Sequence, residues 1–197
     1  MNREAKHNEI DLIAKAKKGD KQALSILVSV YSERIFNLAL RILRNKEDAE
    51  DVLQETFLTV LEKLNTFDGR SNFFTWIYRI ATNTSLMKLR KKKIVFDEFQ
   101  ENMDINGHLD KEFVLNWSND PLLTVQNKEI KNLLDEAINM LPEIFRTVFI
   151  LRDIEQLSIK ETSKILEISE ENVKIRLRRA RLFLREKLAS YFKESVV

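Results

Sequence analysis

The chain has 197 residues, of which 44% are hydrophobic and 32% are charged, with three Gly, two Pro and no Cys. The length allows one large domain or two small ones, and the hydrophobic fraction is sufficient for a buried core. Sheet-rich folds need Gly, Asn and Pro in their tight turns, so the composition disfavours sandwiches, barrels and glycine-rich phosphate loops. It favours an all-α protein. The lack of Cys excludes disulfides and thiolate metal sites, and the apolar runs are too short to cross a membrane.

The net charge of +2 hides an uneven distribution along the chain. Residues 1–93 carry 18 Lys and Arg against 12 Asp and Glu, whereas residues 94–130 carry two against eight. Residues 131–197 are slightly basic, with 13 against 11. Two basic blocks that flank an acidic one indicate that both ends of the chain bind a polyanion. The polar N-terminus has no secretory signal pattern, so we expect the protein to be cytoplasmic.

Helical spacing of apolar residues predicts four helices in the first half of the chain. Gly19-Asp20 divides the first 44 residues into two helices, and Asn45 is typical of the N-cap of a third. Asp68-Gly69 marks a turn, after which Ser71 or Asn72 caps a fourth helix. These four helices are expected to form one bundle over residues 10–93.

The second half of the chain begins with residues that lack helical periodicity. Residues 94–128 are predicted to form a flexible acidic linker, with one short helical piece around Phe113. Residues 129–190 are expected to form a second bundle, in which Pro142 ends one helix or starts the next. Ser158 and Glu161 have the spacing of a capping box before a short helix, and Ser169 caps a long last helix.

The last two predicted helices have the spacing of a helix-turn-helix. In the second of them Val173 and Leu177 begin an apolar face, whereas Lys174, Arg178 and Arg181 follow another face. Residues 174–187 include seven basic residues and one acidic residue. The solvated face of an ordinary helix usually mixes both signs of charge. The pattern therefore favours DNA binding, in which Lys and Arg reach phosphates and base edges.

Aromatic and basic residues cluster between residues 71 and 93. Phe73, Phe74, Trp76 and Tyr78 lie within six residues, and Lys88 and residues 90–93 are basic. Aromatic rings can stack on unpaired bases while cations hold the nucleic-acid backbone. A core role for most of these rings is nevertheless favoured by the sequence alone, because Phe is more often buried.

Acidic residues share one side of the predicted third helix. They are Asp48, Asp51, Glu55 and Glu62, with Gln54 alongside. Such a face suits a basic protein partner. On the pattern alone, a solubilising surface is the favoured interpretation.

Signatures of catalysis are missing from the sequence. It contains no phosphate-binding or dinucleotide-binding loop, no metalloprotease helix and no nucleophile elbow. His108 lies near Asp104 and Asp110, but in a polar linker this proximity is best interpreted as accidental. We expect no catalytic residue, no metal and no cofactor.

Three runs of residues resemble those of the bacterial extracytoplasmic-function (ECF) sigma factors, which are promoter-specificity subunits of RNA polymerase. The runs are D-A-E-D-V-L-Q-E-T-F at 48–57, T-W-I-Y-R-I-A-T-N at 75–83 and V-K-I-R-L-R-R-A-R at 173–181. Their order and spacing make the resemblance specific, and it covers nearly the whole chain. It implies that residues 10–93 are sigma domain two and residues 129–190 are sigma domain four. The acidic linker would then follow the polymerase channels toward the active site and the RNA exit.

The resemblance implies three sets of binding residues. The set that docks on the clamp of the largest polymerase subunit comprises Asp48, Asp51, Gln54 and Glu55. The set that opens the minus-ten element comprises Phe67, Trp76, Arg79, Asn83, Lys88 and Arg90. Within it Phe67 and Asn83 would line a pocket for a flipped base, and Trp76 is either a core residue or a melting wedge. The set that reads the minus-thirty-five element comprises Lys174, Arg176, Arg178, Arg179 and Arg181.

The implied partners are core RNA polymerase, through its clamp and flap, promoter DNA and an anti-sigma protein, without membrane insertion. Two positions depart from the family pattern. Glu167 stands where the helix-turn-helix often has Gly, so we expect a non-Gly residue in the left-handed region there. Ile175 and Arg178 replace the usual Ser and His or Phe, so the base preference does not carry over. A stand-alone dimeric regulator and a helical adaptor that does not bind DNA are the alternative interpretations.

Overall fold

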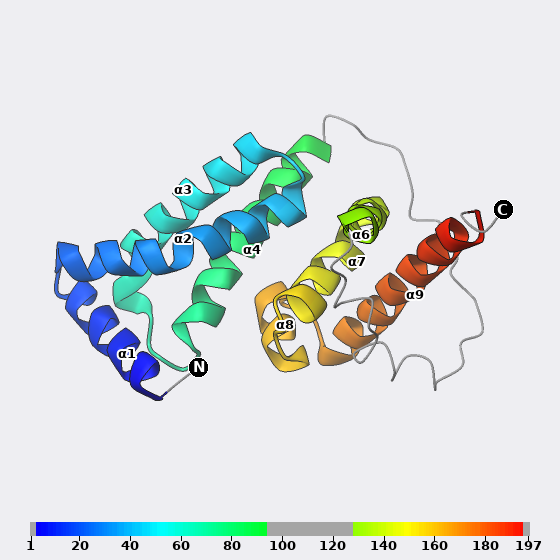
Figure 1. Cartoon of the computed structure of the whole chain (residues 1–197). Coiled ribbons are helices and arrows are strands. Elements are labelled where there is room, and N and C mark those ends of the chain that lie inside the picture. Colours follow the sequence, from blue (N-terminus) through cyan, green and yellow to red (C-terminus); the bar gives the residue numbers. More distant parts are fainter. Residues whose placement is uncertain (1–2, 94–127, 195–197) are drawn as a thin grey trace. The chain divides into compact units, whose positions relative to one another are not determined.

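The computed structural model describes residues 3–93 and 128–194. Every regular element in these two ranges is a helix, which confirms the expected all-α fold (Figure 1). The residues fall into an N-terminal and a C-terminal unit, and each is described by itself. The predicted linker, including the helical piece around Phe113, lies outside the described residues except for Lys128.

The N-terminal unit contains four α-helices, which run from blue to green in Figure 1. They are α1 (Arg3–Lys17), α2 (Lys21–Leu43), α3 (Lys46–Lys63) and α4 (Phe73–Lys93), with a 3-10 turn at Leu64–Thr66 after α3. Gly19 separates α1 from α2 with a φ of +87°. The Asp20 carboxylate then caps α2 by accepting hydrogen bonds from two backbone N–H groups at 2.8 and 3.1 Å. Asn45 caps α3 in the same way, as the sequence predicts.

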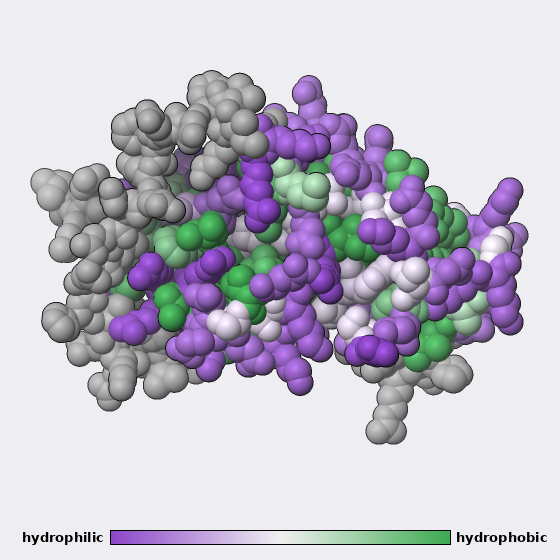
Figure 2. Space-filling model, turned by 180° about the vertical axis from the view of Figure 1, so that it is seen from behind, coloured by the Kyte–Doolittle hydropathy of each residue, from purple (hydrophilic) through white to green (hydrophobic). Residues whose placement is uncertain are grey.

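The core of the N-terminal unit is built around α2, which packs against the other three helices. Ile35, Leu38 and Ile42 of α2 are fully buried, as are Val52 of α3 and Ile77 of α4. The short apolar runs of the sequence predicted no segment able to cross a membrane, but among the described helices α2 is long and apolar enough by length and composition alone. Eight of its residues are buried in the bundle, however, as expected for a core helix. Figure 2 shows a mostly hydrophilic surface with hydrophobic side chains in small patches.

The C-terminal unit contains a second set of helices. They are α6 (Lys128–Met140), α7 (Glu143–Phe149), α8 (Ile159–Leu166) and α9 (Glu170–Glu194), with a π-helical turn at Ile150–Ile154 after α7. Pro142 immediately precedes α7, so it starts a helix. Both α6 and α7 pack against α9. Val148, Leu151 and Leu184 are fully buried in this unit.

The π-helical turn is a feature that sequence periodicity did not indicate. In it the backbone N–H of Glu155 donates to the carbonyl oxygen of Ile150, five residues earlier, at 2.9 Å. Gln156 then takes a φ of +55°, which ends the helix and turns the chain toward α8. An inserted residue of this kind changes backbone bonding without changing the apolar pattern, so spacing alone cannot reveal it.

The helix-turn-helix is formed by α8 and α9 with the predicted caps. The Glu161 carboxylate accepts from the Ser158 N–H at 2.9 Å and from its hydroxyl at 2.7 Å, while the Glu161 N–H donates to the Ser158 oxygen at 3.1 Å. Ser169 caps α9 by accepting from the Asn172 N–H at 3.1 Å. Glu167 lies between the helices with a φ of +56°, so the expected non-Gly residue in the left-handed region is confirmed.

Candidate nucleic-acid interface

The first half of α9 presents a basic surface to solvent. Val173, Leu177 and Ala180 face the core of the C-terminal unit and are buried. Lys174, Arg178 and Arg179 are exposed, and we call these three residues the α9 basic face. Ile175, which is also exposed, lies among them, and Arg176 is half-buried beside them. A helix with this division can lay its cations along a groove of DNA while its apolar side holds it to the fold.

Arg181 does not share the exposure of the α9 basic face. Its guanidinium makes two parallel hydrogen bonds to the Asp153 carboxylate, from Nε at 2.8 Å and from Nη2 at 2.7 Å. The side chains of Arg181 and Asp153 are only 17% and 10% exposed. The sequence grouped Arg181 with the DNA-contacting residues, whereas the structure places it in a nearly buried ion pair. Arg181 follows Arg178 by three residues and Leu177 by four, so it lies between the basic and the apolar sides of α9, and spacing alone did not separate it from the exposed cations.

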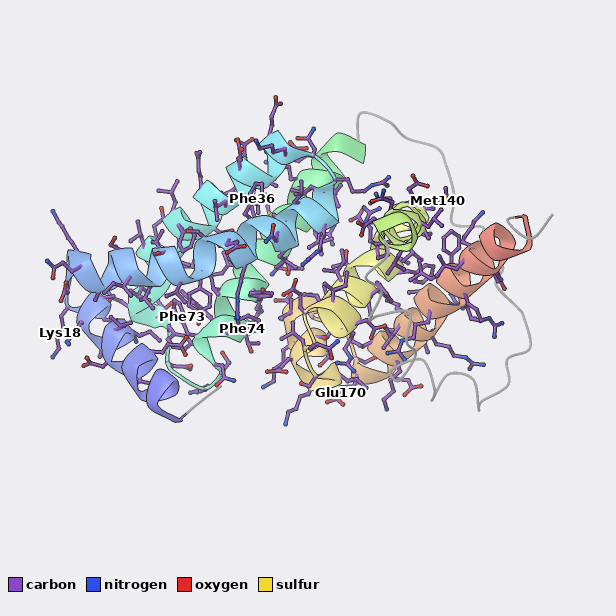
Figure 3. The ribbon with its side chains drawn as sticks, viewed as in Figure 1. Lys18, Phe36, Phe73, Phe74, Met140 and Glu170 are labelled. Carbon is purple, nitrogen blue, oxygen red and sulfur yellow. The ribbon has the colours of Figure 1, made fainter. Side chains whose placement is uncertain are left out.

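The aromatic residues near the start of α4 pack mainly against one another. The Phe73 ring centroid lies 5.5 Å from each of the Tyr31, Phe67 and Trp76 centroids. Phe73 and Tyr78 are buried, so the core interpretation is confirmed for these two rings of the four. Phe74, labelled with Phe73 in Figure 3, is half-buried and stacks 4.0 Å from Tyr78. Trp76 joins the cluster through Phe67 at 5.2 Å, but remains half-buried, with part of its ring accessible.

The accessible side of α4 carries most of the residues that were assigned to the minus-ten element. Arg79, Met87 and Arg90 are exposed and Asn83 is half-buried. Together with Trp76 they recur three or four residues apart, and we call this set the α4 open face. A cation, an amide and an aromatic edge on one helix side are groups that can hold a single strand.

Lys88 lies on a different side of α4, between two carboxylates of α3. Its Nζ is 3.3 Å from an Asp48 oxygen and 2.5 Å from an Asp51 oxygen. The hydrogen bond with Asp51 raises the pKa of Lys88, because it favours the charged amine. Asp48 itself is nearly buried. The structure therefore joins two acids predicted to contact polymerase to a lysine predicted to contact DNA.

The outer side of α3 is acidic with an apolar centre. Asp51, Gln54, Glu55 and Glu62 are exposed, as the sequence predicts. Leu58 and Leu61 lie among them and are 61% and 47% exposed, which the sequence analysis missed. Their spacing from Gln54, by four and seven residues, was the available signal. We call these six residues the α3 docking face.

A pocket of about 550 Å³ lies beside Phe67, between α1 and the segment that leads into α4. Ile13 and Lys17 of α1 line it together with Phe67 and Phe73. The Lys17 amine donates to the Phe67 carbonyl oxygen and lies 5.6 Å from the centre of the Phe67 ring. Asn83 is not among the lining residues, so the structure does not bring Phe67 and Asn83 together in this pocket.

Metal-binding clusters of His, Cys, Asp and Glu are not found in the described parts of the chain. His108, Asp104 and Asp110 lie outside those parts. The α9 basic face, the α4 open face and the outer side of α3 are the charged and aromatic surfaces of the described residues. These surfaces match the chemistry of nucleic-acid and protein recognition.

A capped helix-turn-helix with a basic second helix defines a DNA-binding protein. Residues 27–94 match the family described as Sigma-70 region 2, and residues 131–184 match Sigma-70, region 4. The ECF RNA polymerase sigma factor SigW of Bacillus subtilis (strain 168) is 35% identical over 179 residues, which cover 89% of this chain and 94% of SigW. The ECF RNA polymerase sigma-E factor of Haemophilus influenzae is 30% identical, over 90% of this chain and 93% of that protein. The chain therefore belongs to the ECF sigma factors and directs RNA polymerase to promoters.

Two solved structures share the fold. CnrH, solved in complex with the cytosolic domain of CnrY, has a TM-score of 0.65 and 22% identity, covering 93% of this chain and 98% of CnrH. The sigma factor RpoE of Bartonella quintana, solved with the anti-sigma factor NepR, has a TM-score of 0.60 and 23% identity. That likeness covers 87% of this chain and 98% of RpoE. At these identities the likeness supports the fold alone.

Proposed function

We propose that this sigma factor reads the minus-thirty-five element with the α9 basic face. The proposal rests on the exposure of Lys174, Arg178 and Arg179 on the second helix of a capped helix-turn-helix. The N-terminal part of such a helix enters the major groove, where Arg and Lys can pair with guanine edges and phosphates. Arg176 lies at the border of this face and is proposed to contact the DNA backbone.

The α4 open face is the proposed contact with the minus-ten element. Arg79 and Arg90 would hold phosphates, and the accessible edge of Trp76 would stack on or wedge against an unpaired base. Phe67 and Asn83 are proposed to contact a flipped base from opposite sides of Trp76, outside the pocket beside Phe67, which Asn83 does not line. The support for Phe67 is its packing against Trp76, which supplies a rigid aromatic wall.

The α3 docking face is the proposed contact with core polymerase, at the clamp of the largest subunit. Asp51, Gln54 and Glu55 supply charge and hydrogen-bond acceptors for a basic partner, and Leu58 and Leu61 supply an apolar centre. This combination is typical of protein interfaces, which place apolar contacts within a polar rim. Asp48 is nearly buried beneath Lys88, so we propose that it supports Asp51 rather than touching the partner.

The remaining proposals concern partners and place. We propose that the protein acts in the cytoplasm, by binding alone and without catalysis. RpoE of Bartonella quintana was solved with an anti-sigma factor, and we propose a partner of that kind for this chain. The exposed α3 docking face and α9 basic face are the surfaces that such a partner would cover.

Run-off transcription with purified core polymerase and a library of promoter fragments tests the proposed function. Defined start sites that require this chain, aligned to give two upstream elements, are the expected result. A complex with core polymerase that yields no added transcripts would instead indicate an inhibitor or adaptor. A chain that forms no complex and dimerises on a palindromic site would support a stand-alone regulator.

A further inference from the structure

We propose that Arg181 is a positioning residue, which sets the orientation of α9 through Asp153 and does not bind DNA itself. The proposal rests on the proposed reading of the minus-thirty-five element by α9. It separates Arg181 from the cations of the α9 basic face, with which the sequence motif groups it. It also gives the π-helical turn at Ile150–Ile154 a function, because that turn supplies Asp153.

The bidentate ion pair between Arg181 and Asp153 holds both side chains in one geometry, and we call this ion pair the joint. Two parallel hydrogen bonds, at 2.8 and 2.7 Å, prevent the guanidinium from rotating about a single bond. Both side chains are largely withdrawn from water, so the pair is weakly screened. Removing the cation would leave a nearly buried carboxylate without a partner, which is costly in free energy.

The joint connects α9 to a backbone segment that is itself closely bonded. The Glu155 N–H closes the π-helical turn on Ile150, and the Leu157 N–H donates to the Leu151 carbonyl at 3.0 Å. The Arg152 guanidinium also donates to the Leu157 carbonyl oxygen. Because Asp153 lies between these bonds, it is a stable anchor for α9. π-helical turns occur frequently at functional sites, which fits an anchoring role here.

The position of Arg181 along α9 explains how the joint affects DNA contacts. Arg178 and Arg179 lie within one turn before Arg181, so a rotation or tilt of α9 at this point moves both directly. Hydrogen bonds to base edges require atoms to be placed within a few tenths of an ångström. The joint therefore acts on the α9 basic face without contributing a contact to DNA.

Asp153→Asn distinguishes a positioning role from direct DNA contact by the sign of its effect. The amide preserves the shape of the carboxylate but weakens the pair and leaves Arg181 freer. If Arg181 were a phosphate ligand, this change would maintain or strengthen promoter binding, since it removes a negative charge. If Arg181 positions α9, the same change weakens binding.

The experiment measures binding of the holoenzyme to a promoter fragment with both elements, across a salt series. We expect Asp153→Asn and Arg181→Gln each to lower the affinity on the order of tenfold, the scale of a lost charged hydrogen bond, and the double variant to be no worse than either. The charge swap that combines Asp153→Arg with Arg181→Asp is expected to restore part of the affinity. Affinity for core polymerase is expected to stay unchanged in every variant, because the α3 docking face lies on the other unit. Thermal unfolding and helical circular dichroism of each full-length variant show that the C-terminal unit is still folded.

Two results would overturn the proposal. One is unchanged or tighter promoter binding by Asp153→Asn. The other is a salt dependence that Arg181→Gln reduces by about one ion while Asp153→Asn leaves it unchanged. Arg178→Ala is the control for the underlying function. If Arg178→Ala left promoter affinity unchanged, the proposal that α9 reads the minus-thirty-five element would be wrong. If Arg178→Ala lowered the affinity and one of the two results above were observed, only the Arg181 proposal would be wrong.

Discussion

Basic residues of this chain serve two different purposes, and Lys88 and Arg90 illustrate the difference within one turn of α4. Lys88 is held between Asp48 and Asp51, whereas Arg90 projects from the α4 open face. Because two carboxylates of α3 already neutralise the charge of Lys88, this residue attracts a phosphate only weakly. Exposure and charge partners, rather than residue type, therefore separate structural cations from those available to DNA.

Lys88→Met is expected to lower the free energy of unfolding of the chain, because the nearly buried Asp48 loses its cation. The loss should be roughly 1–2 kcal/mol, between the values for exposed and buried pairs. The salt dependence of promoter binding should not change. Arg90→Met is the matched control, and should reduce the salt slope by about one ion without affecting unfolding. Thermal unfolding and a salt series of holoenzyme binding measure both; a reduced slope for Lys88→Met would contradict this division.

The α9 basic face makes a separate prediction at the scale of single residues. Arg178→Ala and Arg179→Ala are each expected to weaken promoter binding by about 1–3 kcal/mol if the residue pairs with a base edge. Lys187→Ala, farther along α9, provides an exposed cation outside the face and should have a smaller effect. Binding to fragments substituted one base pair at a time measures the contacts. Equal losses for all three variants would indicate a general electrostatic attraction without specific reading.

At the scale of an element, the α3 docking face combines acidic residues with two exposed leucines. We expect Leu58→Ala and Leu61→Ala to lower affinity for core polymerase, each by about 1 kcal/mol or more, because truncation removes apolar area from the centre of the contact. Both side chains are exposed in the free chain, so unfolding should not change. Ile26→Ala, an exposed apolar residue of α2, is the control and should bind normally. The affinity is measured by competition of each unlabelled variant with the labelled wild-type chain for core polymerase. An equal loss of affinity for Ile26→Ala would argue against a localised face.

The capping box of α8 predicts a stability effect at the scale of an element. Ser158→Ala removes the hydroxyl that accepts from the Glu161 N–H, and should cost about 1 kcal/mol of stability. Ser163→Ala is a matched control, because that hydroxyl bonds a carbonyl within α8 and Ala favours the helix. Chemical denaturation of the full chain compares the two. Equal destabilisation by both substitutions would mean that the cap does not hold the helix-turn-helix.

Helices and their ends could be predicted because the signals are local. Asp20, Asn45, Ser158 and Ser169 bond to backbone groups two or three residues away, so spacing along the sequence is enough to find them. Arg181 and Lys88 could not be assigned in this way, because their partners are 28 and about 40 residues distant and are brought near only by folding. The exposed leucines of α3 lie between these cases. Their spacing was visible, but which helix side faces solvent depends on the whole bundle.

At the scale of the molecule, the two proposed DNA contacts lie on separate units, with 34 residues between the described ranges. A promoter presents its two elements at a fixed spacing. Each unit alone offers only a few of the proposed DNA-contacting cations, so each is expected to bind weakly and with strong salt dependence. Polymerase that binds the chain would fix the spacing between the units and make the second contact intramolecular.

We therefore expect the free chain to bind promoter DNA poorly and the holoenzyme to bind it tightly. Fragments in which the spacer between the two elements is lengthened or shortened by a few base pairs provide the sharper test. The holoenzyme should lose affinity on these fragments, because one contact must break or the DNA must deform. The free chain, whose units bind independently, should not distinguish them. Tight binding by the free chain that also depends on spacer length would contradict this expectation. It would mean that the chain itself fixes the distance between its two units, without help from polymerase.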